Sequence, residues 1–196
     1  MSLEQKINNL ETDLHIMGTL VLDSLVGAVR ALEDKDTLKA SEVMDKDDEI
    51  DDAYMKIDQD WFELMATEQP VASDLRLSTS ILQASLHLER LGDLSVYLGK
   101  TTHEIHDLPI PESLHKIVVE MGDMVIDMAS SALESLKNRD AELALSTARK
   151  DELINSLYNK MLNEVPNISG NKDLYSGLFR LITCVRTLER GGDHAV

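Results

Sequence analysis

The chain is 196 residues long and carries 36 acidic against 19 basic residues, a formal net charge of −17 at pH 7. This charge opposes binding to nucleic acid or to an anionic bilayer, and it favours cations and basic protein surfaces as partners. Aromatic residues make up only 4% and glycine and proline are scarce, a composition typical of a helical bundle. The length allows one large domain or two modest ones.

Segments that determine the cellular location are weak or absent in the sequence. The first nine residues lack the apolar core of a signal peptide, and the most apolar stretch, Leu14 to Leu32, is interrupted by Asp23 and Arg30. The single cysteine, Cys184, excludes an intrachain disulfide and fits a reducing compartment. We therefore expect a cytoplasmic protein without direct membrane insertion.

Four prolines interrupt the helical periodicity, because proline lacks the amide hydrogen and clashes with the preceding turn. Between them, apolar residues recur at spacings of three and four, which predicts long amphipathic helices. Three such helices precede the Pro109–Pro111 linker and three follow it. Ser73 and Asp74 are predicted to cap the third helix. The predicted helices are 3–34, 36–67, 73–103, 112–138, 140–163 and 171 to the end.

The two halves of the chain repeat one another. An offset of 104 superposes Met17-Gly18 on Met121-Gly122 and Asp47 on Asp151. Towards the end of each half the offset becomes 100, so four residues are missing from the second copy. This pattern predicts an all-α fold of two tandem three-helix bundles, at 1–107 and 112–196.

The third helix of each half carries one acidic motif, Leu88-Glu89-Arg90-Leu91-Gly92-Asp93 and Leu188-Glu189-Arg190-Gly191-Gly192-Asp193. Acids that stand four apart project from the same face of a helix. Like charges at this spacing destabilise a helix by about 0.2–0.5 kcal/mol, and an internal glycine costs about 1 kcal/mol relative to alanine. Gly92 and Gly192 therefore need a compensating role.

The second helix of each half has an acidic pattern of its own, which includes Asp47 and Asp51 in the first half. Its second-half counterpart has Asp151 and Asn155, where an amide replaces the last carboxylate. A short turn joins the second and third helices, so they should pack antiparallel with their acidic faces together. The predicted clusters are Asp47, Asp51, Glu89 and Asp93 in the first half, and Asp151, Asn155, Glu189 and Asp193 in the second.

Several carboxylates without matching basic residues form an oxygen-rich site for divalent or multinuclear metal, such as zinc, iron, manganese or magnesium. The alternative is that these acids are a solvated surface of a very acidic protein. No phosphate loop, catalytic serine motif or cysteine–histidine pair is present, so the sequence favours a protein that is not an enzyme. A metal-storage or metal-dependent hydrolytic bundle and a passive structural bundle are alternative interpretations.

These motifs together resemble the PhoU family, the regulators of bacterial phosphate uptake. A further match is Gln69-Pro70-Val71-Ala72-Ser73-Asp74-Leu75-Arg76, which resembles the family's stretch entering the third helix. The resemblance implies two pseudo-twofold-related three-helix bundles and metal clusters on the acidic motifs. It also implies repression of the phosphate-starvation response through contact with the ATPase subunit of the phosphate ABC transporter and a phosphate-sensing histidine kinase. Arg76 is expected either to steady the neighbouring acids or to act on the helix end electrostatically. We also expect a homodimer, formed through apolar helix faces.

The sequence departs from the family pattern at three places. Asn155 replaces a usual acid, which weakens the second cluster, and Gly191 replaces a usual aliphatic residue. The chain ends three residues after Asp193, whereas members of the family continue this helix for several turns. The resemblance thus leads us to expect a shortened last helix.

Overall fold

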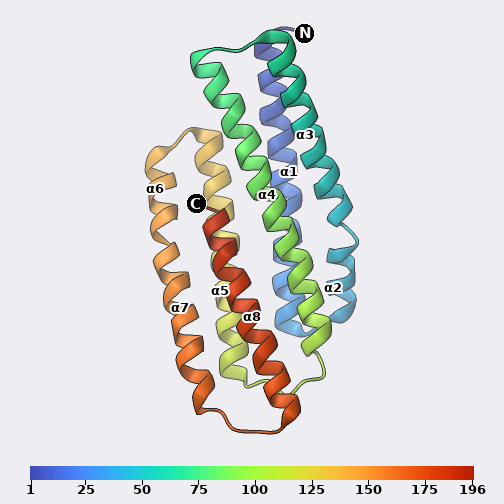
Figure 1. Cartoon of the computed structure of the whole chain (residues 1–196), viewed down its shortest axis with the longest axis vertical. Helices are drawn as coiled ribbons and strands as arrows, with labels where there is room; N and C mark the ends of the chain where they lie inside the picture. Colours follow the sequence, from blue (N-terminus) through green and yellow to red (C-terminus); the bar gives the residue numbers. More distant parts are fainter.

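The computed structural model describes residues 1–196 as eight α-helices and one short 3₁₀ helix, with no β-strand. The all-α, tandem-bundle fold predicted from periodicity is confirmed. Helices α1, α4, α5 and α8 form the centre, with α2–α3 and α6–α7 at opposite edges (Figure 1). The first half contains α1 (Leu3–Asp34), α2 (Thr37–Met44), α3 (Asp47–Glu68) and α4 (Ala72–Ile105). The second contains α5 (Glu112–Asn138), α6 (Ala141–Arg149), α7 (Asp151–Glu164), η1 (Val165–Asn167) and α8 (Lys172–His194).

The second predicted helix of each half is broken once, so the two continuous helices predicted there are wrong. The breaks lie at the equivalent positions Lys46 and Lys150, whose backbone N–H groups each bond a carbonyl three residues earlier, at 3.2 and 2.9 Å. This tightened turn ends one helix and starts another. Lys150 Nζ also donates to Asp127 Oδ2 at 2.6 Å, which ties the second break to α5. Asp47 and Asp151 then open α3 and α7, where the helix dipole favours negative charge.

The turns after the first helix of each half are also duplicated. Lys35 and Arg139 both adopt the left-handed conformation, with φ of 54° and 53°. The next residues, Asp36 and Asp140, accept hydrogen bonds from two backbone N–H groups of α2 and α6. Such caps satisfy orphan donors at a helix start. The same local chemistry therefore sets the same turn twice.

The start of α4 differs from its prediction. The helix begins at Ala72, and the preceding Val71 makes no side-chain cap, so Ser73 and Asp74 lie inside the first turn. Gln69 and Ala72 both have positive φ, 47° and 49°, which turns the chain before the serine is reached. The predicted capping role of Ser73 and Asp74 is therefore wrong, because the backbone turn places the helix start upstream of them.

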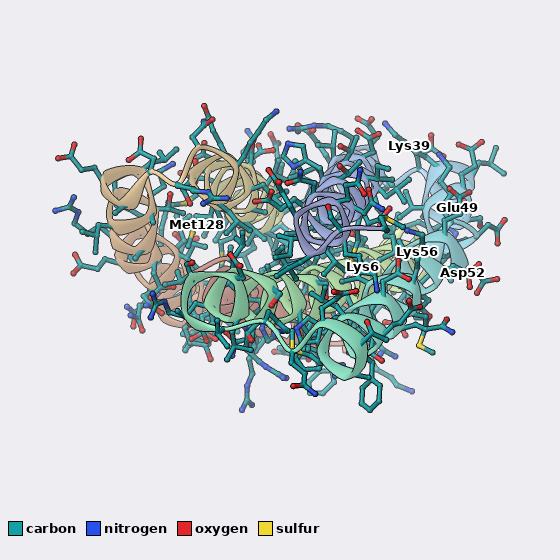
Figure 2. The ribbon with its side chains drawn as sticks, turned by 90° about the horizontal axis from the view of Figure 1, so that it is seen from above. Lys6, Lys39, Glu49, Asp52, Lys56 and Met128 are labelled. Carbon is teal, nitrogen blue, oxygen red and sulfur yellow. The ribbon has the colours of Figure 1, made fainter.

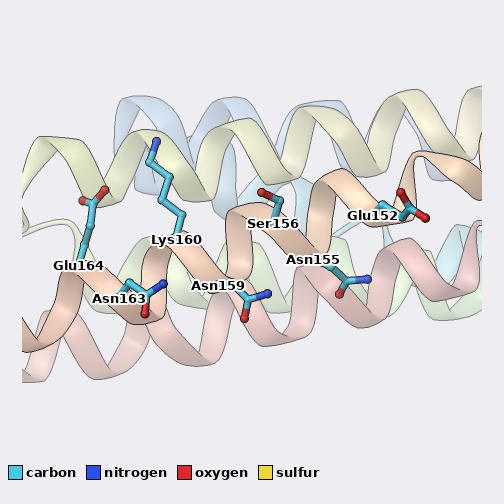
Figure 3. Close-up of a pocket in the computed structure, with 7 residues that line it drawn as sticks. All are labelled: Glu152, Asn155, Ser156, Asn159, Lys160, Asn163 and Glu164. Atoms are coloured by element: carbon cyan, nitrogen blue, oxygen red, sulfur yellow. The ribbon is translucent and has the colours of Figure 1, made fainter.

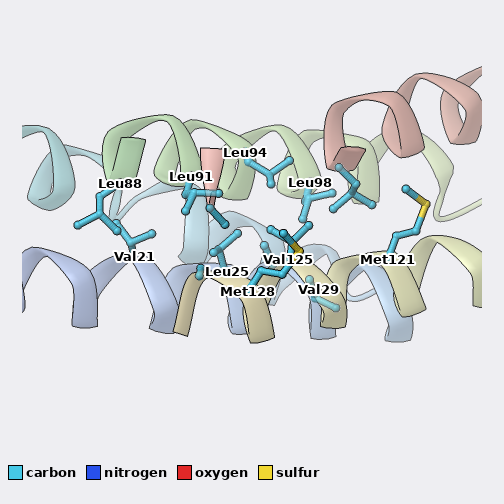
Figure 4. Packing of buried hydrophobic residues seen from close by; sticks show 14 of the residues in the cluster. Val21, Leu25, Val29, Leu88, Leu91, Leu94, Leu98, Met121, Val125 and Met128 are labelled. Carbon is cyan, nitrogen blue, oxygen red and sulfur yellow. The ribbon is translucent and has the colours of Figure 1, made fainter. Parts of the chain in front are cut away.

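One hydrophobic core runs through both halves. Helix α1 packs on α5 and α4 packs on α8, so the halves are not separate globules. Buried residues of α1, α4 and α5 meet in it (Figure 4): Val21, Leu25, Val29, Leu88, Leu91, Leu94, Leu98, Met121, Val125 and Met128. Seen from above, Met128 lies among the helices while charged side chains such as Lys39, Glu49 and Asp52 lie at the periphery (Figure 2).

Two equivalent glycine contacts show that α1 and α5 pack with pseudo-twofold symmetry. A Cβ on Gly18 would lie 2.8 Å from Leu133, and a Cβ on Gly122 would lie 2.7 Å from Val29. Gly18 and Gly122 are equivalent positions, as are Val29 and Leu133. The two helices therefore cross antiparallel about a pseudo-twofold axis, with one close glycine approach on each side.

Helix α1 is long and apolar enough to cross a membrane by length and composition, with a mean hydropathy of 1.4 in its most apolar window. Half of that window is buried against the other helices. The core helix of a water-soluble bundle meets the same criteria, so this single helix is weak evidence for a span.

Candidate metal centre

An isoleucine of the second helix packs on the motif glycine of the third in each half. A Cβ on Gly92 would lie 3.0 Å from Ile50 Cγ2, and a Cβ on Gly192 would lie 2.8 Å from Ile154 Cδ1. Each glycine stands between the two acids of its motif, and each isoleucine stands between the acidic positions of its own helix. The glycines thus let the acid-bearing faces approach closely, which is the compensating role that the sequence required.

The four acids of the first predicted cluster lie close enough to affect one another's ionisation, while their role as metal ligands stays a prediction. Burial, followed by the charges of Asp51 and Asp93, raises the pKa of Asp47 above its ordinary value. Burial also raises the pKa of Glu89, and the charges of Asp93, Asp51 and Asp47 add to that effect while Arg90 opposes it. The four carboxylates of α3 and α4 therefore repel one another across the helix contact.

One carboxylate oxygen of this cluster is buried without a hydrogen-bond partner. It is Oε2 of Glu89. Arg90 Nε lies 3.4 Å from it, but not in hydrogen-bonding geometry, and Arg90 Nη1 donates instead to Asp93 Oδ2 at 3.2 Å. A buried anionic oxygen without a donor is destabilising by about 1–3 kcal/mol or more. A bound cation would relieve both this defect and the mutual repulsion.

The second cluster has the same placement but a different charge. Asp151 Oδ1 is buried without a partner and lies 3.6 Å from where a Cβ on Gly192 would be. Its other oxygen, Oδ2, accepts a hydrogen bond of 2.9 Å from Asn155 Nδ2. Asn155 therefore stabilises Asp151 at the position where Asp51 repels Asp47. Glu189 is half-buried and Asp193 exposed, as are their counterparts in α4.

No three His, Cys, Asp or Glu side chains lie in a geometry that could hold a metal ion. The donor set nevertheless fits hard or borderline cations, because it consists of carboxylate oxygens and one carboxamide. Each cluster contains one orphaned oxygen, Glu89 Oε2 on α4 in the first and Asp151 Oδ1 on α7 in the second, at positions that are not equivalent in the repeat. The residues present are thus suited to a cation, and the carboxylates would have to rotate to coordinate it.

Asp74 and Arg76 lie away from these clusters. Arg76 is exposed and forms no ion pair, and it precedes Glu89 by thirteen residues of α4. That separation is about 20 Å along a helix axis. Arg76 is therefore too far along the helix to steady the acids of the cluster, and its two expected roles near the start of α4 stay predictions.

Comparisons with known proteins agree with this architecture. The family model of the PhoU domain matches residues 14–102 and again 118–196. The chain belongs to the PhoU family. A phosphate-specific transport system accessory protein PhoU homolog of Pseudomonas aeruginosa is 32% identical over 191 residues, which are 97% of this chain and 79% of that protein. A homolog of Clostridium acetobutylicum is 32% identical over an alignment of 195 positions that covers 97% of this chain and 87% of that protein.

Solved PhoU structures have the same fold as this chain. The crystal structure of PhoU from Pseudomonas aeruginosa superposes with a TM-score of 0.93 at 32% identity, and covers 99% of this chain and 93% of that one. The phosphate transport system regulatory protein PhoU from Streptococcus pneumoniae gives 0.89 at 26% identity, over 99% of this chain and 91% of that one. Both halves of the PhoU fold are thus present.

A large open surface lies beside the second cluster of this PhoU chain, along α7. Asn155, Asn159 and Asn163 follow one another at four-residue spacing there, with Lys160 and Glu152 among their neighbours (Figure 3). No hydrophobic residue lines this surface. Its openness and polarity are those of a solvated helix face, so we assign no ligand to it.

Sequence reasoning missed a contact between the two halves at the α4–α8 crossing. His87 Nδ1 lies 3.3 Å from His194 Nδ1, and the ring centroids are 5.5 Å apart. Burial lowers the pKa of His194, and the charges of His87, Arg190 and Arg90 lower it further. Both motif arginines therefore lie near one histidine. The arginine repeated inside each acidic motif was the signal for this arrangement, but only an antiparallel crossing of α4 and α8 brings the two copies together.

Proposed function

We propose that this chain regulates bacterial phosphate uptake and represses the phosphate-starvation response when phosphate is plentiful. It acts in the cytoplasm as a homodimer, through contact with the transporter's ATPase subunit and the sensor histidine kinase. The observation that carries the proposal is the match of two PhoU domains over nearly the whole chain. Relatives at 32% identity are named accessory proteins of the phosphate-specific transport system. The net charge of −17 supports docking on basic protein surfaces.

We also propose that the acidic clusters bind divalent cations. Asp47, Asp51, Glu89 and Asp93 hold the first site, because burial and mutual repulsion make a bound cation favourable there. The second site is weaker, since Asn155 already satisfies one oxygen of Asp151. The cation supplies charge compensation that draws α3 towards α4, which shapes the surface offered to partners. The role is structural and regulatory, without catalysis.

The regulatory proposal is tested with a phosphate-starvation reporter in cells that lack the gene. The intact gene should silence the reporter in rich phosphate, and a variant with Glu89, Asp93, Glu189 and Asp193 changed to amides should not. Matched controls are Asp52→Asn and Glu152→Gln, which neutralise exposed acids of α3 and α7 outside the clusters. If deletion of the gene leaves the reporter under normal control, the proposed regulatory function is wrong.

The cation proposal is tested on purified protein that has been dialysed against a chelator. Adding Zn²⁺, Mn²⁺ or Fe²⁺ should raise the melting temperature by mass action and leave stoichiometric metal after a second dialysis. Glu89→Gln should lower the metal content, while Asp52→Asn should not. If the intact protein binds no metal and its melting temperature does not change, the cation site is refuted. The reporter assay would still test the regulatory function independently.

A further inference from the structure

A pocket of about 400 Å³ opens where α4 and α8 cross. The helices run antiparallel there, so the two copies of the acidic motif face each other across the pseudo-twofold axis (Figure 1). Leu94 of α4 packs over Gly191 of α8, because a Cβ on this glycine would lie only 2.5 Å from Leu94 Cδ2. The departure at Gly191 therefore has a packing role, since it lets the two motifs come together around the pocket.

Three cationic side chains line this pocket: Arg90, Arg190 and Lys100. The chain has only 19 basic residues against 36 acidic ones, so such a concentration is unusual for this surface. Arg90 is engaged by Asp93 at 3.2 Å. Arg190 and Lys100 are exposed and form no ion pair, whereas other basic residues of the chain, Arg90 among them, do form ion pairs. Two unpaired cations thus face one cavity.

Carboxylates also line the pocket, at Asp47 and Asp93. Asp93 is already paired with Arg90, which leaves Asp47 against the two free cations. The excess of positive charge is therefore small, and binding of an anion is expected to be weak and salt-dependent. The pocket must therefore select one anion over another by the geometry of its donors more than by its total charge.

We propose that this pocket binds a phosphate group, either as inorganic phosphate or on a small phosphate ester. A guanidinium fork binds two oxygens of a phosphate in one plane, and Arg190 offers such a fork without losing an existing partner. A phosphate has further oxygens outside that plane, and Lys100, which lines the α4 wall of the same pocket without an ion-pair partner, is the second free donor for them. A carboxylate has only two oxygens in one plane, so it satisfies fewer of these donors. The inference goes beyond the proposed regulatory function. Asp47 and Asp93 of the proposed cation site also line this pocket, so phosphate binding is measured without metal to separate the two sites.

Binding is measured on the metal-free full chain by titration with inorganic phosphate, observed by calorimetry and by ³¹P line width at constant ionic strength. We expect saturable binding with a dissociation constant on the order of 1 mM. Arg190→Gln and Lys100→Gln should each weaken it about tenfold, since each removes a charge-assisted hydrogen bond. Arg186→Gln is the matched control, because Arg186 is exposed on the same helix and does not line the pocket. Circular dichroism confirms that each variant is folded.

A parallel titration with glycerol 3-phosphate identifies the source of the phosphate. Tighter binding of the ester, lost in Arg190→Gln, assigns the pocket to a phosphate ester, whereas tighter binding of the free ion assigns it to inorganic phosphate. The proposal is overturned if the intact chain shows no saturable binding of either, or if Arg190→Gln binds as well as the intact chain. It is also overturned if a short oligoglutamate peptide binds in an Arg190-dependent way while phosphate does not. A negative result here leaves the reporter assay of the regulatory function unaffected.

Discussion

Ile50 of α3 packs directly onto Gly92 of α4, with its Cγ2 only 3.0 Å from the position that a Cβ would occupy on that glycine. Ile154 and Gly192 repeat this contact between α7 and α8. The acids before and after each glycine are thereby held beside the acids of the neighbouring helix. The packing energy of the isoleucine offsets part of the repulsion among the carboxylates, because a buried isoleucine contributes about 1.5–3 kcal/mol.

The first prediction concerns this contact. Gly92→Ala should destabilise the protein by about 1–3 kcal/mol, because the branched Cγ2 of Ile50 cannot rotate away within a helix. Ile50→Ala alone should cost about 2–5 kcal/mol through the cavity it leaves. In the double variant the new methyl group occupies part of that cavity, so the combined loss should be smaller than the sum by at least about 0.5 kcal/mol. Urea unfolding of the four proteins gives the coupling.

Additive losses in this cycle would contradict the direct contact between Ile50 and Gly92. The Ile50→Ala background also provides the control for helix propensity. There Gly92→Ala meets no Cγ2 atom, so it should recover stability by up to about 1 kcal/mol.

The second prediction concerns pH. The pKa values of Asp47 and Glu89 are raised above ordinary values of 3.8 and 4.5, first by burial and then by neighbouring carboxylates. The folded protein therefore binds more protons than the unfolded chain between those ordinary values and the raised ones, and its stability falls as pH rises through that window. Asp47→Asn and Glu89→Gln should each raise the melting temperature of the metal-free protein at pH 7. The gain should shrink as pH falls through the raised pKa values and disappear below about pH 3, where the carboxyl groups are protonated in both states.

Asp52→Asn is the matched control for the pH series, because Asp52 is an exposed acid on α3 that makes no ion pair. Its melting temperature should track that of the intact protein at both pH values. Equal stabilisation by all three amides would mean that the effect comes from net charge rather than from the cluster.

The third prediction concerns the amide in the second cluster. Asn155→Asp removes the 2.9 Å hydrogen bond to Asp151 and places a like charge one turn away. The metal-free variant should lose about 1 kcal/mol, or about 2–4 °C in melting temperature for a chain of this size. With Zn²⁺ or Mn²⁺ the loss should shrink or reverse, and the metal content should rise, since the cluster regains a fourth carboxylate.

Asn159→Asp provides a control on the same side of α7, one turn further along (Figure 3). Residue 155 precedes it by four and is an amide, so the new charge gains no carboxylate neighbour there. An Asn155→Asp variant that melts like Asn159→Asp, with and without metal, would show that residue 155 lies outside the cluster.

The helices and the duplication could be predicted because they depend on local periodicity and on spacings that recur at offsets of 104 and 100. The contact of the two acidic faces in the first half followed from the same spacings. The breaks at Lys46 and Lys150 could not be predicted, because apolar residues keep the same spacing through them. The predicted start of α4 was wrong because Ala72 has a positive φ, and an alanine in a sequence gives no signal for that conformation.

The contacts between residues on either side of the α4–α8 crossing could not be predicted from the sequence. His87 and His194 lie 107 positions apart and have no counterparts in the other halves, so no repeat pointed to them. Arg90 and Arg190 did repeat, but their meeting depends on the crossing angle and on the missing side chain at Gly191. The acids were found by their spacing along one chain segment, whereas the cationic pocket arises only from tertiary packing.

The fourth prediction uses two glycines that occupy equivalent positions with different neighbours. A Cβ on Gly122 would meet Val29 at 2.7 Å, and valine has a single preferred side-chain rotamer in a helix. A Cβ on Gly18 would meet the ends of Leu133 at 2.8 Å, and Leu133 is half-buried beside an open groove into which it can rotate.

Gly122→Ala should therefore destabilise the protein by about 1–2 kcal/mol, since overpacking of about 1–3 kcal/mol exceeds the gain in helix propensity. Gly18→Ala should be neutral or stabilising by up to about 1 kcal/mol, because Leu133 moves and the propensity gain remains. Thermal unfolding of both variants measures the difference. A far-ultraviolet circular dichroism spectrum of each, recorded at a temperature below its transition, confirms that it is folded. Equal effects in both would mean that the two halves pack with full symmetry at this crossing, and that the difference between valine and leucine is absorbed by movement of α1 against α5.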